Sequence, residues 1–422
     1  MKFPTPRPRR LWLPIAGALL LISGIAVPPG VASADPRQQL QHTPGPGAAR
    51  WVATWGASPQ DMGNNNYTGT IRNIVFAAVG GHSVRVRLTN TFGNQPLKIG
   101  DAYIGVSGAD GNIHGPNVPL TFAGSRTTTI PQGAEALSDP VSLTVPALTD
   151  LAVSVYVPQA TERTGHSDSR ETSYITQGTD HAGDTTTAAY APTSSWLFVD
   201  SVDVMAGPPN QGTVVALGDS ITDGAASTVN ANKRWPNDLA RRLNARKGVT
   251  LSVADEGISG NQVLQDTSSY GVSALNRFDR DVVDRTGAKD VILLEGINDI
   301  GAADAQANQL IAAYQQLIAR AHAAHLKIFG GTLTPFKGDW EIATGYWSPE
   351  KEQTRETVNN WILHSGAFDG VIDFAKATAD PSNPQLLNPA YDSNDHLHPN
   401  DAGYQAMADT INLPMLLRPV TG

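Results

Sequence analysis

Four short segments in the second half of the chain carry side chains whose types and spacing could perform chemistry. They are residues 218–224 (GDSITDG), 256–261 (EGISGN), 295–299 (EGIND) and 395–399 (DHLHP). A serine hydroxyl is a poor nucleophile at neutral pH unless a base beside it removes its proton. An aspartate three residues before a histidine can accept a hydrogen bond from Nδ1 and leave Nε2 free as that base. Ser220, His398 and Asp395 could therefore be a nucleophile, its base and the group that orients the base.

The two middle segments offer hydrogen-bond donors. At Gly260 the backbone amide can approach a ligand with no side chain in the way. Asn298 offers a side-chain amide. Each motif also has a structural interpretation, because Ser220 is a common type of helix N-cap, Gly260 and Asn298 are common in turns, and His398 would be ordinary in an exposed loop.

Metal binding is a second alternative for the last segment. Asp395, His396 and His398 are all possible ligands. No other cluster of carboxylates and histidines in the sequence completes such a site. The sequence therefore predicts neither a metal nor a cofactor.

The four segments follow predicted elements of one sheet. Five short apolar runs are typical of buried strands: residues 213–217, 250–254, 290–294, 327–332 and 371–374. Helical patterns separate them, most clearly at 303–324. Apolar strands alternating with amphipathic helices predict a three-layer α/β domain whose parallel sheet is covered on both faces. Ligands of such sheets bind at the carboxyl ends of the strands, where the polar segments stand.

Residues 51–205 have a different pattern. Apolar residues alternate with polar ones in short runs such as 82–88 (HSVRVRL) and 151–157 (LAVSVYV), and Gly, Asn, Asp and Pro separate the runs. Period-two runs between turns predict an all-β, jelly-roll-like sandwich. Residues 206–212 (AGPPNQG) are typical of a linker to the α/β domain at 213–422.

The N-terminus predicts export. Four positive charges precede an apolar run at 11–27, and the run ends in prolines before an Ala-Ser-Ala sequence at 32–34. This order is typical of a cleaved signal peptide over residues 1–34, with a disordered leader at 35–50, and it predicts a secreted protein. An uncleaved membrane anchor is the alternative, but the run is short for a span.

Composition excludes several function classes. The chain has no cysteine, which rules out disulfides and cysteine nucleophiles. Its formal net charge is -9, and loss of residues 1–34 would remove four positive charges and no acids. A surface this acidic argues against nucleic acid or anionic membranes as partners. No later stretch is long and apolar enough to suggest stable membrane insertion.

The order of the four segments resembles that of SGNH hydrolases of the GDSL esterase family. The blocks of that family are a G-D-S-[LI] turn, a glycine, a G-x-N-D turn and a D-x-x-H sequence. This chain has them in that order at 218–221, Gly260, 296–299 and 395–398. The resemblance covers the chain from residue 213 onward, and the β-region also resembles that of two-domain secreted members.

The resemblance implies a role for each residue. Ser220 attacks the acyl carbon of an ester, and His398 takes its proton and passes it to the leaving alcohol. Asp395 fixes the tautomer of the imidazole. The amides of Ser220 and Gly260 and the side chain of Asn298 form the oxyanion hole. The reaction would pass through an acyl-enzyme.

The substrate is open within the family, and we expect an acyl, most simply acetyl, ester of a carbohydrate. A β-sandwich next to a catalytic domain often binds polysaccharide or shapes the site. The loop 335–349 carries Trp340, Tyr346 and Trp347, whose flat rings suit a sugar face. The same rings could instead pack the loop onto the body of the protein. A lipase or phospholipase, or a carbohydrate-binding protein with a silent catalytic domain, are the alternatives.

Overall fold

Alternation of apolar and polar residues in the first half of the chain produces two antiparallel sheets. The computed structural model describes residues 49–63, 66–338 and 345–417. The first sheet contains β1 (Arg50–Gly56), β16 (Val199–Ala206), β4 (Gly81–Thr89) and β10 (Val141–Val145) in that order, with β9 (Glu135–Leu137) also on β4. The second contains β14 (Ala191–Thr193), β13 (Ser173–Ile175), β3 (Tyr67–Ala77), β11 (Thr149–Thr161), β6 (Asp101–Val106) and β7 (Val118–Pro119).

Side-chain direction in β4 shows why these residues form a sheet. Val84, Val86 and Leu88 are buried, whereas the arginines between them are only partly so. The buried residues of β4 share one apolar cluster with β11 residues of the second sheet, such as Val155. Shorter strands complete this region: β2 (Gln60–Asp61), β5 (Leu97–Ile99), β8 (Thr128–Ile130), β12 (Thr164–His166) and β15 (Trp196–Leu197). Between residues 66 and 206 every described element is a strand, in agreement with the alternation.

The second half of the chain forms the expected parallel sheet. Its strands lie in the order β18 (Thr250–Gly257), β17 (Asn210–Gly218), β19 (Ala288–Leu294), β20 (Lys327–Gly331) and β21 (Gly370–Ile372). All pairings are parallel, and all five predicted strands take part. The chain leaves β17 for β18 on one side and returns to β19 on the other. The sheet therefore has its topological switch point at the carboxyl end of β17, where ligands of such sheets bind.

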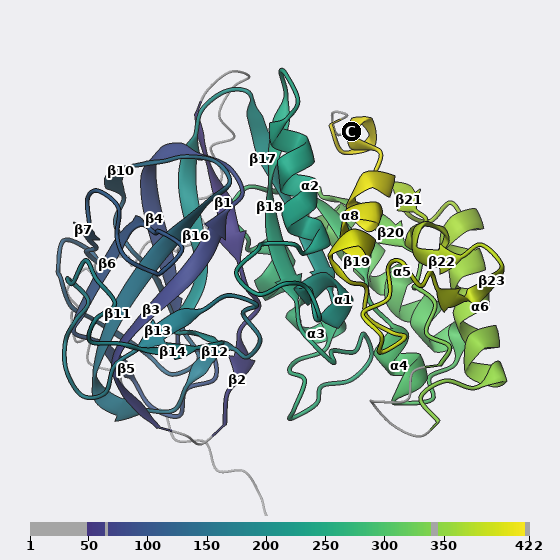
Figure 1. The fold of residues 1–422 in the computed structure, drawn as a ribbon, viewed down its shortest axis with the longest axis horizontal. Helices are drawn as coiled ribbons and strands as arrows, with labels where there is room; N and C mark the ends of the chain where they lie inside the picture. The colour runs from purple at the N-terminus through teal and green to yellow at the C-terminus, as the bar shows by residue number, and fades with distance from the viewer. Residues whose placement is uncertain (1–48, 64–65, 339–344, 418–422) are drawn as a thin grey trace, which may run out of the picture. The chain divides into compact units, whose positions relative to one another are not determined.

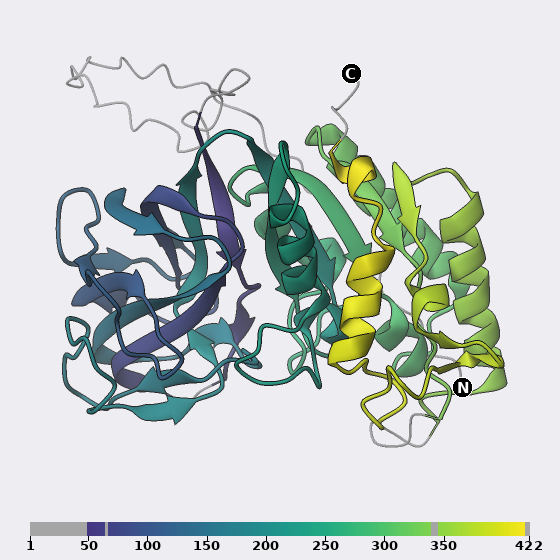
Figure 2. The same cartoon turned by 45° about the horizontal axis from the view of Figure 1, so that its top comes forward.

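Helices pack on this sheet through one apolar cluster. They are α1 (Ser220–Asp223), α2 (Trp235–Asn244), α3 (Ala274–Phe278), α4 (Ile297–Gly301), α5 (Ala307–Ala323), α6 (Pro349–His364), α7 (Phe374–Thr378), α8 (Asp401–Thr410) and α9 (Leu413–Leu416). A short π-helix, η2 (Asp279–Val283), follows α3, and β22 (Ala379–Asp380) and β23 (Asn383–Leu387) form a hairpin. Figures 1 and 2 show α2 and α8 side by side, and α5 packs on α6. The three-layer arrangement stays a prediction.

Helix α5 begins later than the sequence pattern suggested, at Ala307 instead of 303, because Gln306 and Gln309 form a reciprocal capping box. Leu310, Tyr314 and Leu317 are buried as expected. None of the helices in the described ranges has both the length and the apolar character that a bilayer span requires.

The two halves share buried polar contacts. β16 ends at Ala206 and β17 begins at Asn210, so the connection is shorter than the expected linker at 206–212. The amide of Ala53 in β1 donates to the carbonyl of Thr286 at 2.9 Å, and Ser252 Oγ in β18 donates to the carbonyl of Ala53 at 2.7 Å. These described strands belong to one compact unit. The β-region is therefore bonded directly to the strands that carry the polar segments.

Candidate active site

Ser220 stands at the first position of α1, directly after the carboxyl end of β17. Asp219 caps the helix by accepting a hydrogen bond from the amide of Ile221 at 3.0 Å. The turn needs a glycine before it, because a Cβ on Gly218 would lie 2.5 Å from the carbonyl oxygen of Leu294. First-turn amides have no partner inside a helix and can face a developing negative charge.

A chain of hydrogen bonds links Ser220, His398 and Asp395. Ser220 Oγ lies 2.9 Å from His398 Nε2, and His398 Nδ1 lies 2.6 Å from Asp395 Oδ2. A carboxylate beside Nδ1 fixes the proton on that nitrogen, so Nε2 is left to accept from the serine hydroxyl. The structure therefore brings together, with the expected atoms in contact, three residues separated by up to 178 positions.

The loop that carries Asp395 is built to keep its side chain charged. Its Oδ1 accepts from the amides of Leu397 and His398 at 2.9 and 2.8 Å. Burial acts to raise the pKa of Asp395, but the hydrogen bonds from His398 and these amides outweigh it and hold the pKa below its usual range. Asn394 and His396 adopt positive φ angles of 81° and 64°, an uncommon conformation that turns the loop tightly here.

His396 belongs to a separate pair. Its Nδ1 lies 2.6 Å from Asp392 Oδ2, and its side chain is 41% exposed. It therefore does not compete with His398 for Asp395. Across the described residues, no group of three or more histidines and acids is placed to hold a metal ion.

Asn298 lies at the start of α4 with both ends of its amide engaged. Its Nδ2 donates to the carbonyl of Asn261 at 2.9 Å, and its Oδ1 accepts from the hydroxyl of Tyr346 at 2.8 Å. One N–H of the amide remains for another acceptor, because an NH₂ group has two hydrogens. Asp299 fixes the same loop by accepting from the amides of Val263 and Leu264 at 2.8 and 2.9 Å.

Gly260 satisfies two constraints at once. Its φ angle is +78°, which favours glycine, and a Cβ there would collide with the ring of Tyr270. Tyr270 is 48% exposed, so an open aromatic face borders the backbone at Gly260. The loop is held by Asn261 Nδ2, which donates to the carbonyls of Tyr270 and Val272 at 2.6 and 3.0 Å.

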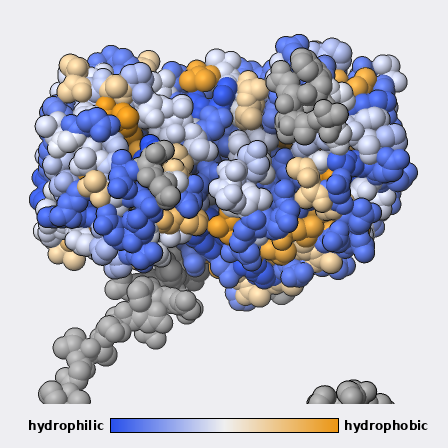
Figure 3. Space-filling model, turned by 90° about the horizontal axis from the view of Figure 1, so that it is seen from below, coloured by the Kyte–Doolittle hydropathy of each residue, from blue (hydrophilic) through white to orange (hydrophobic). Residues whose placement is uncertain are grey.

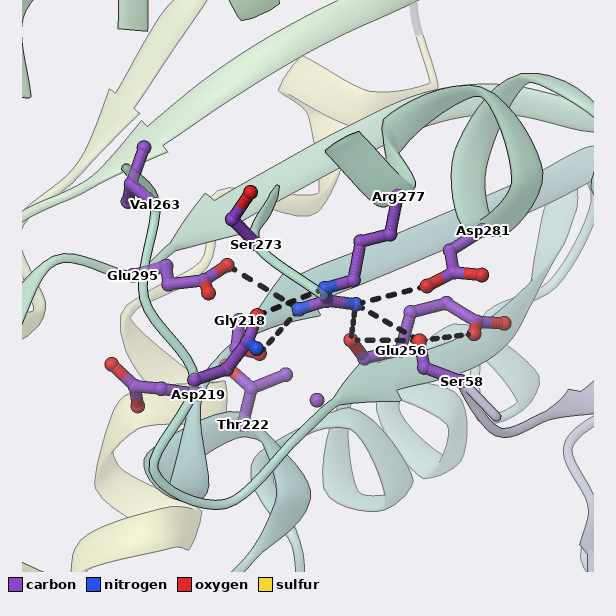
Figure 4. A network of polar contacts seen from close by, with 12 residues as sticks. Ser58, Gly218, Asp219, Thr222, Glu256, Val263, Ser273, Arg277, Asp281 and Glu295 are labelled. Atoms are coloured by element: carbon purple, nitrogen blue, oxygen red, sulfur yellow. Dashed lines mark hydrogen bonds and ion pairs between the residues drawn. The ribbon is translucent and has the colours of Figure 1, made fainter. Parts of the chain in front are cut away.

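Beneath these residues lies Arg277, with a side chain that is 0% exposed (Figure 4). Its Nη2 donates to the carbonyl of Gly218 at 2.9 Å, and its Nε donates to Asn261 Oδ1 at 3.0 Å. Its Nη1 donates to the carbonyl of Glu256 at 2.7 Å and forms an ion pair with Asp281 at 3.2 Å. One guanidinium therefore fixes the ends of β17 and β18 and the loop after Gly260.

Several acids around the site are buried, and their pKa values respond to that burial. Burial raises the pKa of Asp219 to about 7, although the amide of Ile221 favours its charged form. It raises the pKa of Glu295 to about 8 in spite of Arg277, which lies 3.4 Å away. It raises the pKa of Asp299 to about 6. Burial therefore favours the protonated form of Glu295, whereas Asp281 forms ion pairs with both Arg277 and Arg280.

The aromatic residues of the loop 335–349 are placed differently from one another. Tyr346 is buried at 1% exposure, with its ring edge-on to Phe336 and its hydroxyl on Asn298, so it packs in the core and does not face a sugar. Trp347 is partly buried, with the ammonium of Lys337 5.0 Å from its ring centre. Trp340 lies outside the described residues.

Sequence reasoning missed three residues that contact the site, namely Arg277, Tyr270 and His166. It named Tyr346 for its ring and missed the hydroxyl that binds Asn298. None of the three missed residues stands in a motif, and the contacts of Arg277 and His166 join positions far apart in the chain. No local signal in the sequence marks Arg277 or His166, because a buried charged group finds its partners only through the fold.

Figure 3 shows the protein from below, the side on which Figure 1 draws α1 and α4. Hydrophilic residues cover most of this face, and apolar residues lie among them in smaller patches. Only three large apolar side chains within the described ranges are strongly exposed: Val229, Tyr270 and Val371. This face of the protein is therefore largely polar, with apolar patches in it.

A serine, a histidine and a carboxylate bonded in this order at the carboxyl edge of a parallel sheet is the arrangement of hydrolases that act through a serine nucleophile. Residues 216–406, a little under half of the chain, match the sequence model of the GDSL-like lipase/acylhydrolase family. The matched range includes Ser220, His398 and Asp395. The catalytic region of this chain belongs to that family, and the protein is an ester hydrolase.

Solved structures with a similar chain include a protein from Desulfitobacterium hafniense DCB-2 assigned to the G-D-S-L family of lipolytic proteins, with 21% identity, 47% of this chain and 97% of that chain covered, and a TM-score of 0.36. A GDSL-like lipase from Bacteroides thetaiotaomicron has 18% sequence identity and a TM-score of 0.38, and the match covers 49% of this chain and 88% of that chain. The aryl esterase of M. smegmatis has 14% sequence identity and a TM-score of 0.38, and the match covers 47% of this chain and 95% of that chain. No curated protein sequence matches the chain.

Proposed function

We propose that the protein hydrolyses carboxylic esters through an acyl-enzyme formed on Ser220. The observation that carries the proposal is the chain of hydrogen bonds from Ser220 through His398 to Asp395. Ser220 Oγ attacks the acyl carbon while its proton passes to His398 Nε2, and Asp395 balances the imidazolium. His398 then protonates the leaving alcohol, and water attacks the acyl-enzyme by the same route.

The oxyanion of each tetrahedral intermediate needs donors that are already in place. We assign them to the amides of Ser220 and Gly260 and to the remaining N–H of Asn298 Nδ2. Ser220 supplies a first-turn helix amide, and the carbonyl of Asn261 and the hydroxyl of Tyr346 orient the Asn298 amide.

Replacement of the nucleophile tests this proposal directly. Ser220→Ala should abolish hydrolysis of a chromogenic acetate ester and leave the thermal unfolding transition in place. Ser125→Ala, which changes an exposed serine of the β-region, should keep wild-type turnover. Turnover by Ser220→Ala near that of the wild type would refute the assignment.

For the substrate we propose an O-acyl, most simply acetyl, ester of a carbohydrate. The exposed ring of Tyr270 at Gly260 gives the site a flat apolar surface with a polar tip, which suits a sugar ring. The face seen in Figure 3, on which hydrophilic residues outnumber apolar ones, supports a polar alcohol over a lipid. Acetate and octanoate esters of one alcohol should differ more than tenfold in kcat/KM in favour of acetate. A preference for octanoate would favour a lipase or phospholipase instead.

We extend the proposal to Trp347, whose partly buried ring we assign to the alcohol side of the site. Trp347→Ala should raise KM for acetylated polysaccharide and leave turnover of a small acetate ester unchanged. Equal losses on both substrates, or a fall of several degrees in Tm, would assign the ring to packing alone.

Export is proposed from the sequence of residues 1–34. Their positive start, apolar run and Ala-Ser-Ala sequence support removal of this segment during secretion. N-terminal sequencing of the protein from a culture medium tests it, and the expected first residue is Asp35. Recovery of the intact N-terminus in a membrane fraction would favour an anchor.

A further inference from the structure

The β-region contributes a buried histidine to the edge of the proposed active site. His166, the last residue of β12, is 2% exposed. Its Nε2 lies 2.9 Å from Oδ1 of Asp223, and its Nδ1 lies 3.1 Å from the carbonyl oxygen of Ser58. A carbonyl and a carboxylate can only accept hydrogen bonds. Both ring nitrogens must therefore donate, which makes His166 an imidazolium paired with a carboxylate.

The other oxygen of that carboxylate holds the loop that contains Gly260. Asp223 Oδ2 accepts from the amide of Ser259 at 3.1 Å and from its hydroxyl at 2.7 Å. Ser259 is joined by one peptide bond to Gly260, which carries a proposed oxyanion donor. Asp223 is also the last residue of α1, the helix that begins at Ser220. Its carboxylate therefore ties the serine turn to the oxyanion loop.

Asp223 requires a positive partner, because a buried carboxylate without one is strongly disfavoured. Arg234 lies nearby, but its Nε donates to the backbone carbonyl of Asp223 at 2.5 Å and not to the carboxylate. Asp255 adds a second buried acid. The pKa of Asp223 is lowered and that of His166 is raised, because their mutual attraction outweighs the effect of burial on each. The β-region thus supplies, through His166, the charged hydrogen-bond partner of the Asp223 carboxylate, and Arg234 adds a weaker favourable charge.

We infer that His166 is a positioning residue of the esterase, holding the oxyanion loop in place through Asp223 and Ser259. The inference rests on the proposed function of Ser220 and Gly260. It gives the β-region a part in the reaction itself, beside any role in binding substrate. Because oxyanion donors act on the transition state, their misplacement should reduce kcat and leave KM for a small ester nearly unchanged.

The test replaces His166 by glutamine in the full-length protein, because glutamine can donate to Asp223 but brings no charge. With a chromogenic acetate ester, His166→Gln should lower kcat at least about tenfold, a fraction of the cost of a lost oxyanion donor, and change KM less than about twofold. His181 provides a matched control, since it also lies in the β-region with its Nδ1 2.8 Å from a carboxylate, that of Asp184. His181→Gln should keep kcat within about twofold.

A double-mutant cycle separates positioning from general loss of structure. Ser259→Ala removes the hydroxyl contact with Asp223 and should lower kcat by a smaller factor than His166→Gln. Because both changes act through the same carboxylate, the loss in the double variant should be smaller than the product of the single losses. The inference would be overturned if the loss of kcat in the double variant equalled the product of the two single losses. A wild-type kcat in His166→Gln would also overturn it. If His166→Gln does not fold, an unchanged kcat in Ser259→Ala overturns it and a reduced kcat upholds it.

Failure of this inference can be told apart from failure of the proposed function. If Ser220→Ala remains active, the proposed function is wrong whatever the His166 variant does. If Ser220→Ala is inactive and His166→Gln keeps the wild-type kcat, the function stands and the role of His166 is wrong.

Discussion

Replacement of Tyr346 by phenylalanine isolates the contribution of one buried hydroxyl to the proposed oxyanion hole. The hydroxyl donates to Asn298 Oδ1 at 2.8 Å, and the second anchor of the amide is the bond from Nδ2 to the carbonyl of Asn261 at 2.9 Å. Phenylalanine keeps the ring, which packs against Phe336 and over Gly301. The change therefore removes one of the two anchors of the Asn298 amide and keeps the ring in place.

The expected loss of kcat follows from the two hydrogen bonds that anchor the Asn298 amide. Loss of a complete oxyanion donor costs about 3 to 4 kcal/mol of transition-state stabilisation, and the net worth of a single hydrogen bond is about 1 kcal/mol. One missing anchor should thus lower kcat by roughly two- to tenfold, since about 1.4 kcal/mol is a factor of ten. KM for a small ester should not change, because the donor acts on the transition state. Stability should fall by about 1 to 3 kcal/mol, because Asn298 Oδ1 is left buried without a partner.

The assay is steady-state hydrolysis of a chromogenic acetate ester, with urea unfolding of the same preparations. Tyr67→Phe is the matched control, because it removes a buried hydroxyl that donates to the carbonyl of Thr176 in the β-region. It should lower stability by a similar amount and leave kcat unchanged. A wild-type kcat in Tyr346→Phe, or equal loss of kcat in both variants, would refute the reasoning.

Three further outcomes are expected. His398→Ala should lower kcat about a thousandfold or more and His396→Ala far less, measured on the same ester, and the reverse ranking would exchange their roles. Gly260→Ala should lower both kcat and Tm, because the new Cβ meets Tyr270 in a backbone conformation that disfavours alanine. Burial raises the pKa of Glu295 to about 8 in the folded protein, whereas the unfolded chain releases this proton near the ordinary pKa of a glutamate. Between these two pKa values the folded state binds the proton and the unfolded state does not, so the free energy of unfolding falls as pH rises. Glu295→Gln should make the free energy of unfolding, measured in urea at pH 5 to 8, depend less steeply on pH, by at most about 1.4 kcal/mol per pH unit. An unchanged slope would contradict the raised pKa of Glu295.

The parallel sheet and the placement of the reactive residues could be predicted because they depend on local pattern. Apolar runs of strand length mark β17 to β21, and each polar segment follows a strand because the chain must turn there. The spacing of Asp395 and His398 is short enough for one loop to join them, and the structure gives that pair the expected contact. The boundary at 206–212 was less predictable, since strand pairing extends β17 back to Asn210.

The loop aromatics show where local pattern stops being informative. Tyr346 and Trp347 are adjacent in sequence and have similar rings, yet the first is buried with its hydroxyl on Asn298 and the second is only partly covered. Their difference arises from Gly301 in α4, where the absence of a side chain makes room for the ring of Tyr346. No spacing rule connects positions 301 and 346.

By itself the sequence determined the sheet and the order of the four segments, and it predicted the role proposed for Ser220, because strand periodicity and motif spacing act over a few residues. Only the tertiary structure decided which distant residues orient these segments. Arg277 reaches the carbonyl of Gly218, and His166 reaches Asp223 from the β-region, across 59 and 57 positions of the chain. Such contacts arise because a buried charge must find its partners wherever folding brings them, and that requirement leaves no local pattern in the sequence.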